Sequence, residues 1–341
     1  LALLAILALP LGLLFISRPN IGLLVVVFLI PFEIFNTIPG MPDASLSAMK
    51  LISFAAFAGA GIHFLVFRKS DRLVSAPQNW LILLFLGAAG ISYFFAINPA
   101  NTLSKDLKLV RVLLLYLVTI NVVRTRTDLR HVLWTMIVAG LLCALYGIFT
   151  YHFNPSVLGS DRRISGTMDH PNGFAAAMVA LVPLVLSLLM SERHIGLRVL
   201  LALTAPVLVY GILLSGSRGG MVALVFALGL HIFRQRHRLV VLAVFLMLAL
   251  LLLAVAPPEV KERFSLAPER YPTADFSIER RLTYQKLGLE LLQEHPLTGI
   301  GLHGFPDAYA RSQYRFLQSD DVKRVAHNMY LEIATGTGLL G

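Results

Sequence analysis

Residues 199–233 read VLLALTAPVLVYGILLSGSRGGMVALVFALGLHIF and determine the class of fold. Two apolar runs, 199–215 and 219–233, are separated by a short stretch that contains Arg218. Apolar runs that approach ~20 residues are typical of helices that cross a membrane. In lipid every backbone polar group needs a partner within the protein, which a helix provides and an open strand does not. We therefore predict two membrane helices joined by a cationic connection.

Similar apolar runs occur along the whole chain. Of its 341 residues, 57% are hydrophobic and only 14% are charged, which excludes an ordinary soluble domain. We predict an all-α fold: a polytopic membrane helix bundle with about eleven visible spans and about twelve in the full protein, because both ends look cut. The runs lie at 1–16, 21–36, 50–67, 80–97, 107–123, 131–153, 172–190, 199–215, 219–233, 239–256 and 327–341.

Basic residues alternate between successive connections, and this alternation predicts the orientation. The positive-inside rule places the more basic set of connections in the cytoplasm. That set contains Arg18, Arg68, Lys69, Arg72, Arg124, Arg126, Arg130, Arg193, Arg198, Arg234, Arg236 and Arg238. The outer set contains Lys50, Lys105, Lys108, Arg162, Arg163 and Arg218. The net charge of +10 is thus explained by membrane topology, and no nucleic-acid partner is predicted.

One outer connection is long and polar. It divides the chain into a helix bundle (1–256), a large loop (257–326) and the start of a further membrane helix (327–341). Within the loop, SIERRLTYQKLGLELLQEHP predicts an amphipathic helix that Ser277 caps and that ends before Pro296. Its apolar residues are expected to face the membrane surface or the bundle. They are Ile278, Leu282, Leu289 and Leu292.

Arg218 and the glycines around it suggest an anion site. The stretch SGSRGG can leave one helix and present backbone N–H groups at the positive start of the next, beside a guanidinium. The alternative is an arginine that anchors a tight turn at the membrane interface. A second cationic pair, Arg162 and Arg163, lies in another outer connection, where an anionic headgroup would be found. Neighbouring Asp169 and His170 lack metal-ligand spacing and are interpreted as turn and cap residues.

The last apolar run begins with His327 and Asn328 on the same outer side. An imidazole is half protonated near neutral pH, so His327 is the candidate base for a hydroxyl group. GIGLHG (299–304) fits a dinucleotide-binding pattern, but it follows a predicted helix and not a strand, so we interpret it as a turn. The one cysteine, Cys143, lies inside an apolar run and is interpreted as a packing residue.

Four stretches together resemble the O-antigen ligase and polymerase superfamily of bacterial inner-membrane proteins, in order, spacing and topology. They are RRISGTMDHPNGFA (162–175), LLSGSRGG (213–220), ERRLTYQKLGLELLQEHPLTGIGLHGF (279–305) and AHNMYLEIATGTGLLG (326–341). The resemblance implies a multi-pass inner-membrane enzyme with its active site facing the periplasm. It also implies a metal-independent, inverting glycosyltransferase without a cofactor. The enzyme would transfer a glycan from undecaprenyl pyrophosphate to an acceptor hydroxyl, which in ligases is on the lipid A core.

The resemblance and the residues together predict a division of roles. Arg218, with Arg163 or Arg162, would bind the donor pyrophosphate and stabilise its growing charge, where other enzymes use Mg²⁺. His327 would take the acceptor proton. Arg280 or Arg281, with Asn328, would help to position sugar or phosphate.

Two alternatives remain open at this point. A polymerase of the same superfamily would extend the glycan on its lipid carrier, and an Arg-X10-Gly pattern of some polymerases occurs from Arg162 to Gly173 and from Arg218 to Gly229. Chance matches of that pattern are expected in a chain with this much arginine and glycine. A lipid-linked sugar flippase or another transporter would instead place ionisable residues along a path at mid-membrane. The candidate residues cluster on the outer side, which favours the enzyme.

Overall fold

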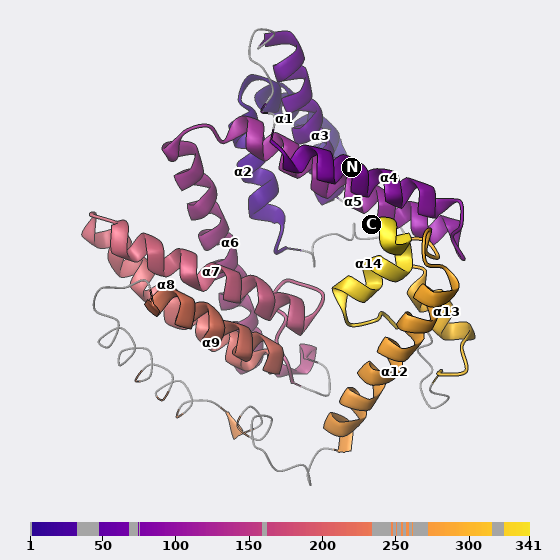
Figure 1. Cartoon of the computed structure of the whole chain (residues 1–341). Helices are drawn as coiled ribbons and strands as arrows, with labels where there is room; N and C mark the ends of the chain where they lie inside the picture. Colours follow the sequence, from indigo (N-terminus) through magenta and orange to yellow (C-terminus); the bar gives the residue numbers. More distant parts are fainter. Residues whose placement is uncertain are drawn as a thin grey trace. The chain divides into compact units, whose positions relative to one another are not determined.

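The computed structural model describes residues 2–32, 48–67, 74, 76–158, 162–233, 272–315 and 324–341, with isolated positions between 247 and 261. Regular structure within these residues is helical, in agreement with the all-α prediction (Figure 1). The helices are α1 (Ala2–Ser17), α2 (Pro19–Leu29), α3 (Ala48–Ile62) with a π-helical turn (His63–Phe67), α4 (Gln78–Tyr93), α5 (Pro99–Val122), α6 (Arg126–Phe153), α7 (Pro171–Ser191), α8 (Ile195–Leu214), α9 (Arg218–Phe233), α12 (Pro272–Glu294), α13 (Phe305–Arg311) and α14 (Met329–Thr337).

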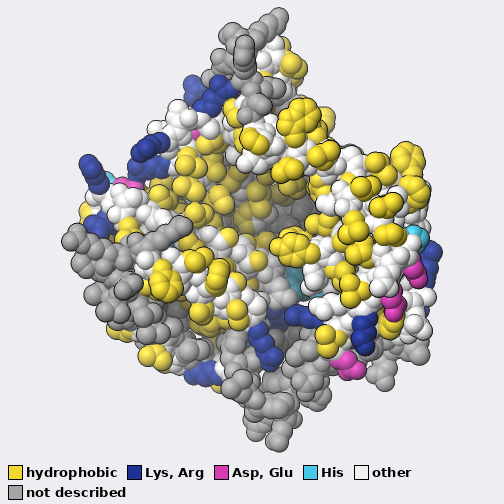
Figure 2. All heavy atoms as spheres, viewed as in Figure 1, with side chains coloured by type: hydrophobic (Ala, Val, Ile, Leu, Met, Phe, Trp, Pro, Cys, Tyr) yellow, Lys and Arg dark blue, Asp and Glu magenta, His cyan; other side chains and the backbone are white. Residues whose placement is uncertain are grey.

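Four helices of the described chain are long and apolar enough to cross a membrane: Met49–Phe67, Arg126–Phe153, Pro171–Ser191 and Ile195–Leu214. A fifth span arises if α1 and α2, which are bent by 114° at Arg18, are counted as one. Large hydrophobic side chains are exposed on these helices, and Figure 2 shows hydrophobic atoms over much of the visible surface. The membrane bundle is thus confirmed in outline. The higher span count stays a prediction, and the run 239–256 lies largely outside the described residues.

The chain divides into two compact units. The first contains Leu1–Asp71 and Val122–Ser265, and the second contains Arg72–Asn121 and Leu266–Gly341. The second unit therefore groups α4 and most of α5 with the helices of the long connection. The division into 1–256, 257–326 and 327–341 concerns placement in the membrane and stays a prediction.

The core of the first unit is built around α7. Its residues Phe174, Met178, Val182 and Val185 are fully buried and recur at helical spacing on one face. They belong to one apolar cluster with residues of α6, α8 and α9. Lipid offers little hydrophobic driving force between helices, so close packing of this kind holds them together. Cys143 of α6 is fully buried in the same cluster, which confirms its packing role.

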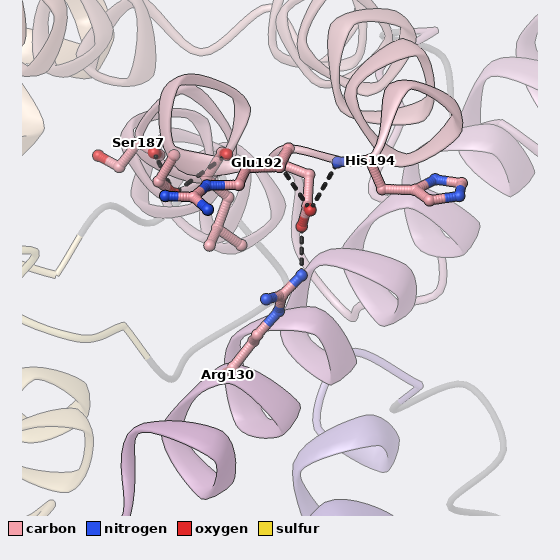
Figure 3. Close-up of polar contacts among 7 residues, drawn as sticks. Arg130, Ser187, Glu192 and His194 are labelled. Atoms are coloured by element: carbon pink, nitrogen blue, oxygen red, sulfur yellow. Dashed lines mark hydrogen bonds and ion pairs between the residues drawn. The ribbon is translucent and has the colours of Figure 1, made fainter.

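Polar contacts mark the two opposite ends of the first unit. At one end, Glu192, between α7 and α8, forms an ion pair with Arg130 of α6 (Figure 3). The N–H group of His194, followed by that of Arg193 and by the Arg130 guanidinium, holds the pKa of Glu192 below its usual value. At the other end, the N–H group of Ile164 donates to the carbonyl oxygen of Leu214 at 3.3 Å. Arg130 thus lies at the opposite end of these helices from Ile164 and its neighbour Arg163, and the side of the membrane that each end faces stays a prediction.

In the second unit, the stretch 296–304 runs beside the end of α14. The N–H groups of Ile300 and Gly301 donate to the carbonyl oxygens of Thr335 and Gly336, both at 2.9 Å. Gly301 has φ +88°, and a Cβ there would lie 2.5 Å from the Cβ of Ala96, so only glycine fits. GIGLHG therefore forms a turn before α13, as predicted.

Helix α12 begins earlier than predicted and also packs a face that the sequence analysis did not assign. It begins at Pro272, so Ser277 lies inside the helix and the predicted cap is wrong. Its packed face consists of Tyr284, Leu287 and Leu291, which contact α13 and α14 residues. The other apolar face exposes Leu282 and Leu289. That Leu282 and Leu289 face the membrane surface or the bundle therefore stays a prediction.

Candidate active site

The connection between α8 and α9 presents Arg218 at a helix start. Helix α8 ends at Leu214, and Gly216 then adopts a left-handed conformation with φ +60°, as is common just after a helix. The hydroxyl of Ser217 accepts a hydrogen bond from the N–H group of Gly220 at 3.2 Å and so caps α9. Arg218 is consequently the first residue of α9, and its side chain is exposed.

Arg218 adds its positive charge to the start of a helix. The first turn of a helix carries partial positive charge, so the two together attract anions. Backbone N–H groups at a helix start and a guanidinium are both donors that bind phosphate groups. The anion site predicted for SGSRGG stays a prediction.

Arg163 links the end of α8 to the start of α7 through two hydrogen bonds. Its Nε donates to the carbonyl oxygen of Ser215 at 2.7 Å, and its terminal nitrogen donates to Oδ1 of Asn172, in the first turn of α7, at 2.8 Å. Ser215 is fully buried. Arg163 therefore orients the segment that carries Arg218, a positioning role that the sequence analysis did not assign.

Arg162 contacts a different element. Its guanidinium lies 5.5 Å from the ring centroid of Tyr151, near the end of α6, in a cation–π arrangement. Arg162 also has φ +47°, a conformation that non-glycine residues adopt rarely and mostly at functional or strained positions. The two neighbouring arginines thus have separate surroundings within one loop.

The beginnings of α7 and α9 lie close together. A Cβ at Gly220 would lie 2.8 Å from the Cβ of Ala175, so the glycine permits this approach. His170 precedes α7, and its Nδ1 accepts the N–H group of Asn172 at 3.1 Å, which confirms the predicted cap. In the part of the chain that the structure describes, no three His, Cys, Asp or Glu side chains group as metal ligands would.

The second unit holds the other predicted residues, around His327. The exposed imidazole of His327 stacks on the buried ring of Tyr284 at 5.8 Å between centroids. Tyr284 also makes an edge contact with Tyr309 at 5.2 Å. Burial, and next the phenol of Tyr309, raises the pKa of Tyr284 above its usual value. A neutral aromatic ring therefore contacts the predicted base.

Basic residues of this unit lie near the same ring. Arg280 is one helical turn before Tyr284, and both its charge and that of Arg324 act on the Tyr284 phenol. Arg281 is exposed on α12. Asn328 caps α14, because its Oδ1 accepts the N–H groups of Tyr330 and Leu331 at 3.1 and 3.3 Å. The predicted opening of the last helix by His327 and Asn328 is confirmed.

Sequence reasoning missed Tyr284 and Arg324 as neighbours of His327. The spacing of Arg280 and Tyr284, one turn apart on a predicted helix, could have indicated that the two side chains lie on the same face. The structure thus links Arg163 to the segment before Arg218 in the first unit, whereas Arg162 contacts Tyr151. It gathers Arg280 and Asn328 around His327 in the second. The convergence of both groups on a single active site stays a prediction.

The site and fold define a polytopic helical membrane protein with clustered arginines and an exposed histidine. Compared with known protein families, the chain matches the O-antigen ligase family over residues 200–341. This match supports the superfamily that the quoted motifs indicated. The family implies a membrane glycosyltransferase of the O-antigen ligase or polymerase type. The matched part includes Arg218 and His327, whereas Arg162 and Arg163 precede it. None of the curated proteins matches the chain.

Proposed function

We propose that the protein transfers a glycan from undecaprenyl pyrophosphate to a hydroxyl group of the lipid A core. The transfer takes place on the periplasmic side of a bacterial inner membrane. The observation that carries this proposal is the exposed Arg218 at the first position of α9. An arginine at the positive end of a helix attracts anions, and the donor's pyrophosphate is such an anion.

The chemistry follows from the bonds that change. The acceptor oxygen attacks the anomeric carbon, and the bond between that carbon and the pyrophosphate oxygen breaks with inversion. The leaving pyrophosphate gains negative charge, which Arg218 stabilises through paired N–H donors. His327 accepts the proton of the attacking hydroxyl, and its contact with Tyr284 orients the imidazole. No metal ion or cofactor takes part in this scheme.

The other arginines have supporting roles in the scheme. Arg163 keeps the Arg218 segment in place through Ser215, and its remaining N–H donors can face the donor phosphate. Arg162 contributes charge to the same loop. Arg280 and Arg281 on α12 help to position the sugar, and Asn328 combines its capping role with a contact from its amide nitrogen.

A polymerase of the same superfamily is the second candidate, because it would use the same donor and the same arginines. The two differ in the acceptor, which is a lipid A core for a ligase and a lipid-linked glycan for a polymerase. The large connection close to His327-Asn328 favours the ligase.

The deciding experiment supplies each acceptor separately. Purified full-length protein is incubated with a glycan on undecaprenyl pyrophosphate, together with lipopolysaccharide that lacks O antigen. Transfer to the lipopolysaccharide, in the presence of EDTA, is the expected result. Growth of the lipid-linked glycan without transfer would show a polymerase, and loss of activity in EDTA would overturn the metal-independent scheme. Transport of the donor across vesicles without any transfer would show a flippase.

A further inference from the structure

Glu332 lies in the first turn of α14 and binds the segment that carries His327. Its Oε2 accepts a hydrogen bond from the N–H group of Ala326 at 2.8 Å. Ala326 is buried, and it directly precedes His327. The carboxylate thus folds back over the start of its own helix and holds the residue before the candidate base.

The second carboxylate oxygen of Glu332 is also confined. Oε1 is buried without a hydrogen bond, and it lies 3.7 Å from Nδ1 of His303, in the turn before α13. The charge of Lys105, from α5, acts on the same carboxylate. Contacts with Ala326 and His303 therefore limit how the Glu332 side chain can rotate.

The backbone of His327 needs such support. His327 has φ +52°, in the left-handed region that side chains with a Cβ rarely adopt. This conformation persists where surrounding contacts impose it. Glu332 fixes the backbone before His327, and the Asn328 cap fixes the backbone after it. The direction of the imidazole therefore depends on both contacts.

We propose that Glu332 is a positioning residue: its carboxylate holds the Ala326 N–H group and so places the His327 imidazole for proton transfer. This inference rests on the proposed function, in which His327 is the base. It adds a residue that acts through the backbone of His327 and has no contact with the donor pyrophosphate. Loss of the contact should slow proton transfer and leave donor binding unchanged.

The test uses two substitutions of similar size. Glu332→Gln keeps a side-chain oxygen that can accept the Ala326 N–H group, and its amide N–H can face Nδ1 of His303. Glu332→Met fills the same space without an acceptor. A misplacement of about 1 Å at a catalytic group can cost about 10²-fold in rate. We expect kcat for glycan transfer to fall about 10²-fold in the Met variant and by less than about threefold in the Gln variant.

Two further measurements separate positioning from general loss of structure. Binding of undecaprenyl pyrophosphate to the full-length protein should be unchanged in both variants. Glu332→Met in a His327→Ala background should reduce the residual single-turnover rate no further, because the placed group is already absent. Glu294→Gln, at an exposed carboxylate of α12, is the matched control and should transfer at the normal rate.

Each outcome bears on a stated claim. Normal kcat in Glu332→Met, or equal loss in the Gln and Met variants, would overturn the positioning role. A further loss on adding Glu332→Met to His327→Ala would also overturn it. If His327→Ala itself transfers normally, the proposed base is wrong, which is a separate failure from that of Glu332.

Discussion

The Nε atom of Arg163 donates a hydrogen bond to the carbonyl oxygen of Ser215 across 2.7 Å, three residues before Arg218. This bond makes Arg163 a structural partner of the SGSRGG segment as well as a candidate phosphate ligand. Both arginines were predicted to bind the donor, and Arg163 also holds the backbone at Ser215, close to Arg218 in the chain. The two residues should therefore respond differently to substitution.

Replacement of Arg163 by alanine should lower both stability and activity. It removes the donor to the buried Ser215 carbonyl, and an unsatisfied buried group costs about 1–3 kcal/mol. Arg218→Ala, at an exposed position, should lower activity with little change in thermal stability. Thermal unfolding of both purified variants in detergent measures the contrast. Equal melting temperatures would show that the Arg163 bond contributes nothing to stability.

Lysine at position 218 should abolish most glycan transfer, although the variant should still insert into the membrane. Lysine keeps the positive charge but lacks the planar fork that contacts a phosphate through two N–H groups. An arginine that only anchored the helix at the membrane interface would tolerate this change. Transfer assays on matched amounts of membrane-inserted protein distinguish the two roles. Near-normal transfer by Arg218→Lys would support the anchor.

The sequence predicted features that depend on local chemistry. Apolar runs indicated helices, and His170 and Asn328 were correctly placed at helix starts, because caps depend on nearby residues. The predicted start of α12 was wrong. Ser277 is a residue type that often caps helices, but the helix begins earlier, at Pro272.

Contacts between distant residues were beyond prediction from local patterns. The bond from Arg163 to Ser215 joins positions 52 residues apart, and only the packed helices bring them together. The stacking of Tyr284 on His327 depends in the same way on the packing of α12 against α14.

Tyr284→Phe should retain most transfer activity, whereas Tyr284→Leu should lose much of it. Phenylalanine keeps the ring on which His327 stacks, and leucine removes the flat surface. The Michaelis constant for the donor should stay constant in both, because the ring orients the base and does not bind pyrophosphate. Steady-state kinetics measures this. A defect in Tyr284→Phe as large as that in Tyr284→Leu would indicate that the hydroxyl group is what matters.

Cysteine labelling should place the long connection outside the cytoplasm. In a Cys143→Ala background, a cysteine at Ser277 should react with an impermeant maleimide in intact spheroplasts. A cysteine at Arg236 should react only after the membrane is broken. The alternation of basic connections demands this difference. Labelling of position 277 only in broken membranes would reverse the orientation and move the proposed active site to the cytoplasmic side.

His327→Ala and Arg218→Ala should fail at different steps. Removal of a general base costs about 10²–10⁴-fold in rate, so His327→Ala should transfer almost no glycan yet bind undecaprenyl pyrophosphate normally. Arg218→Ala should lose that binding, because the pyrophosphate then lacks its guanidinium partner. Single-turnover transfer and binding of radiolabelled undecaprenyl pyrophosphate, both in EDTA, measure the two steps. Retention of more than about a tenth of the normal rate by His327→Ala is above what loss of a base permits and would exclude His327 as the base.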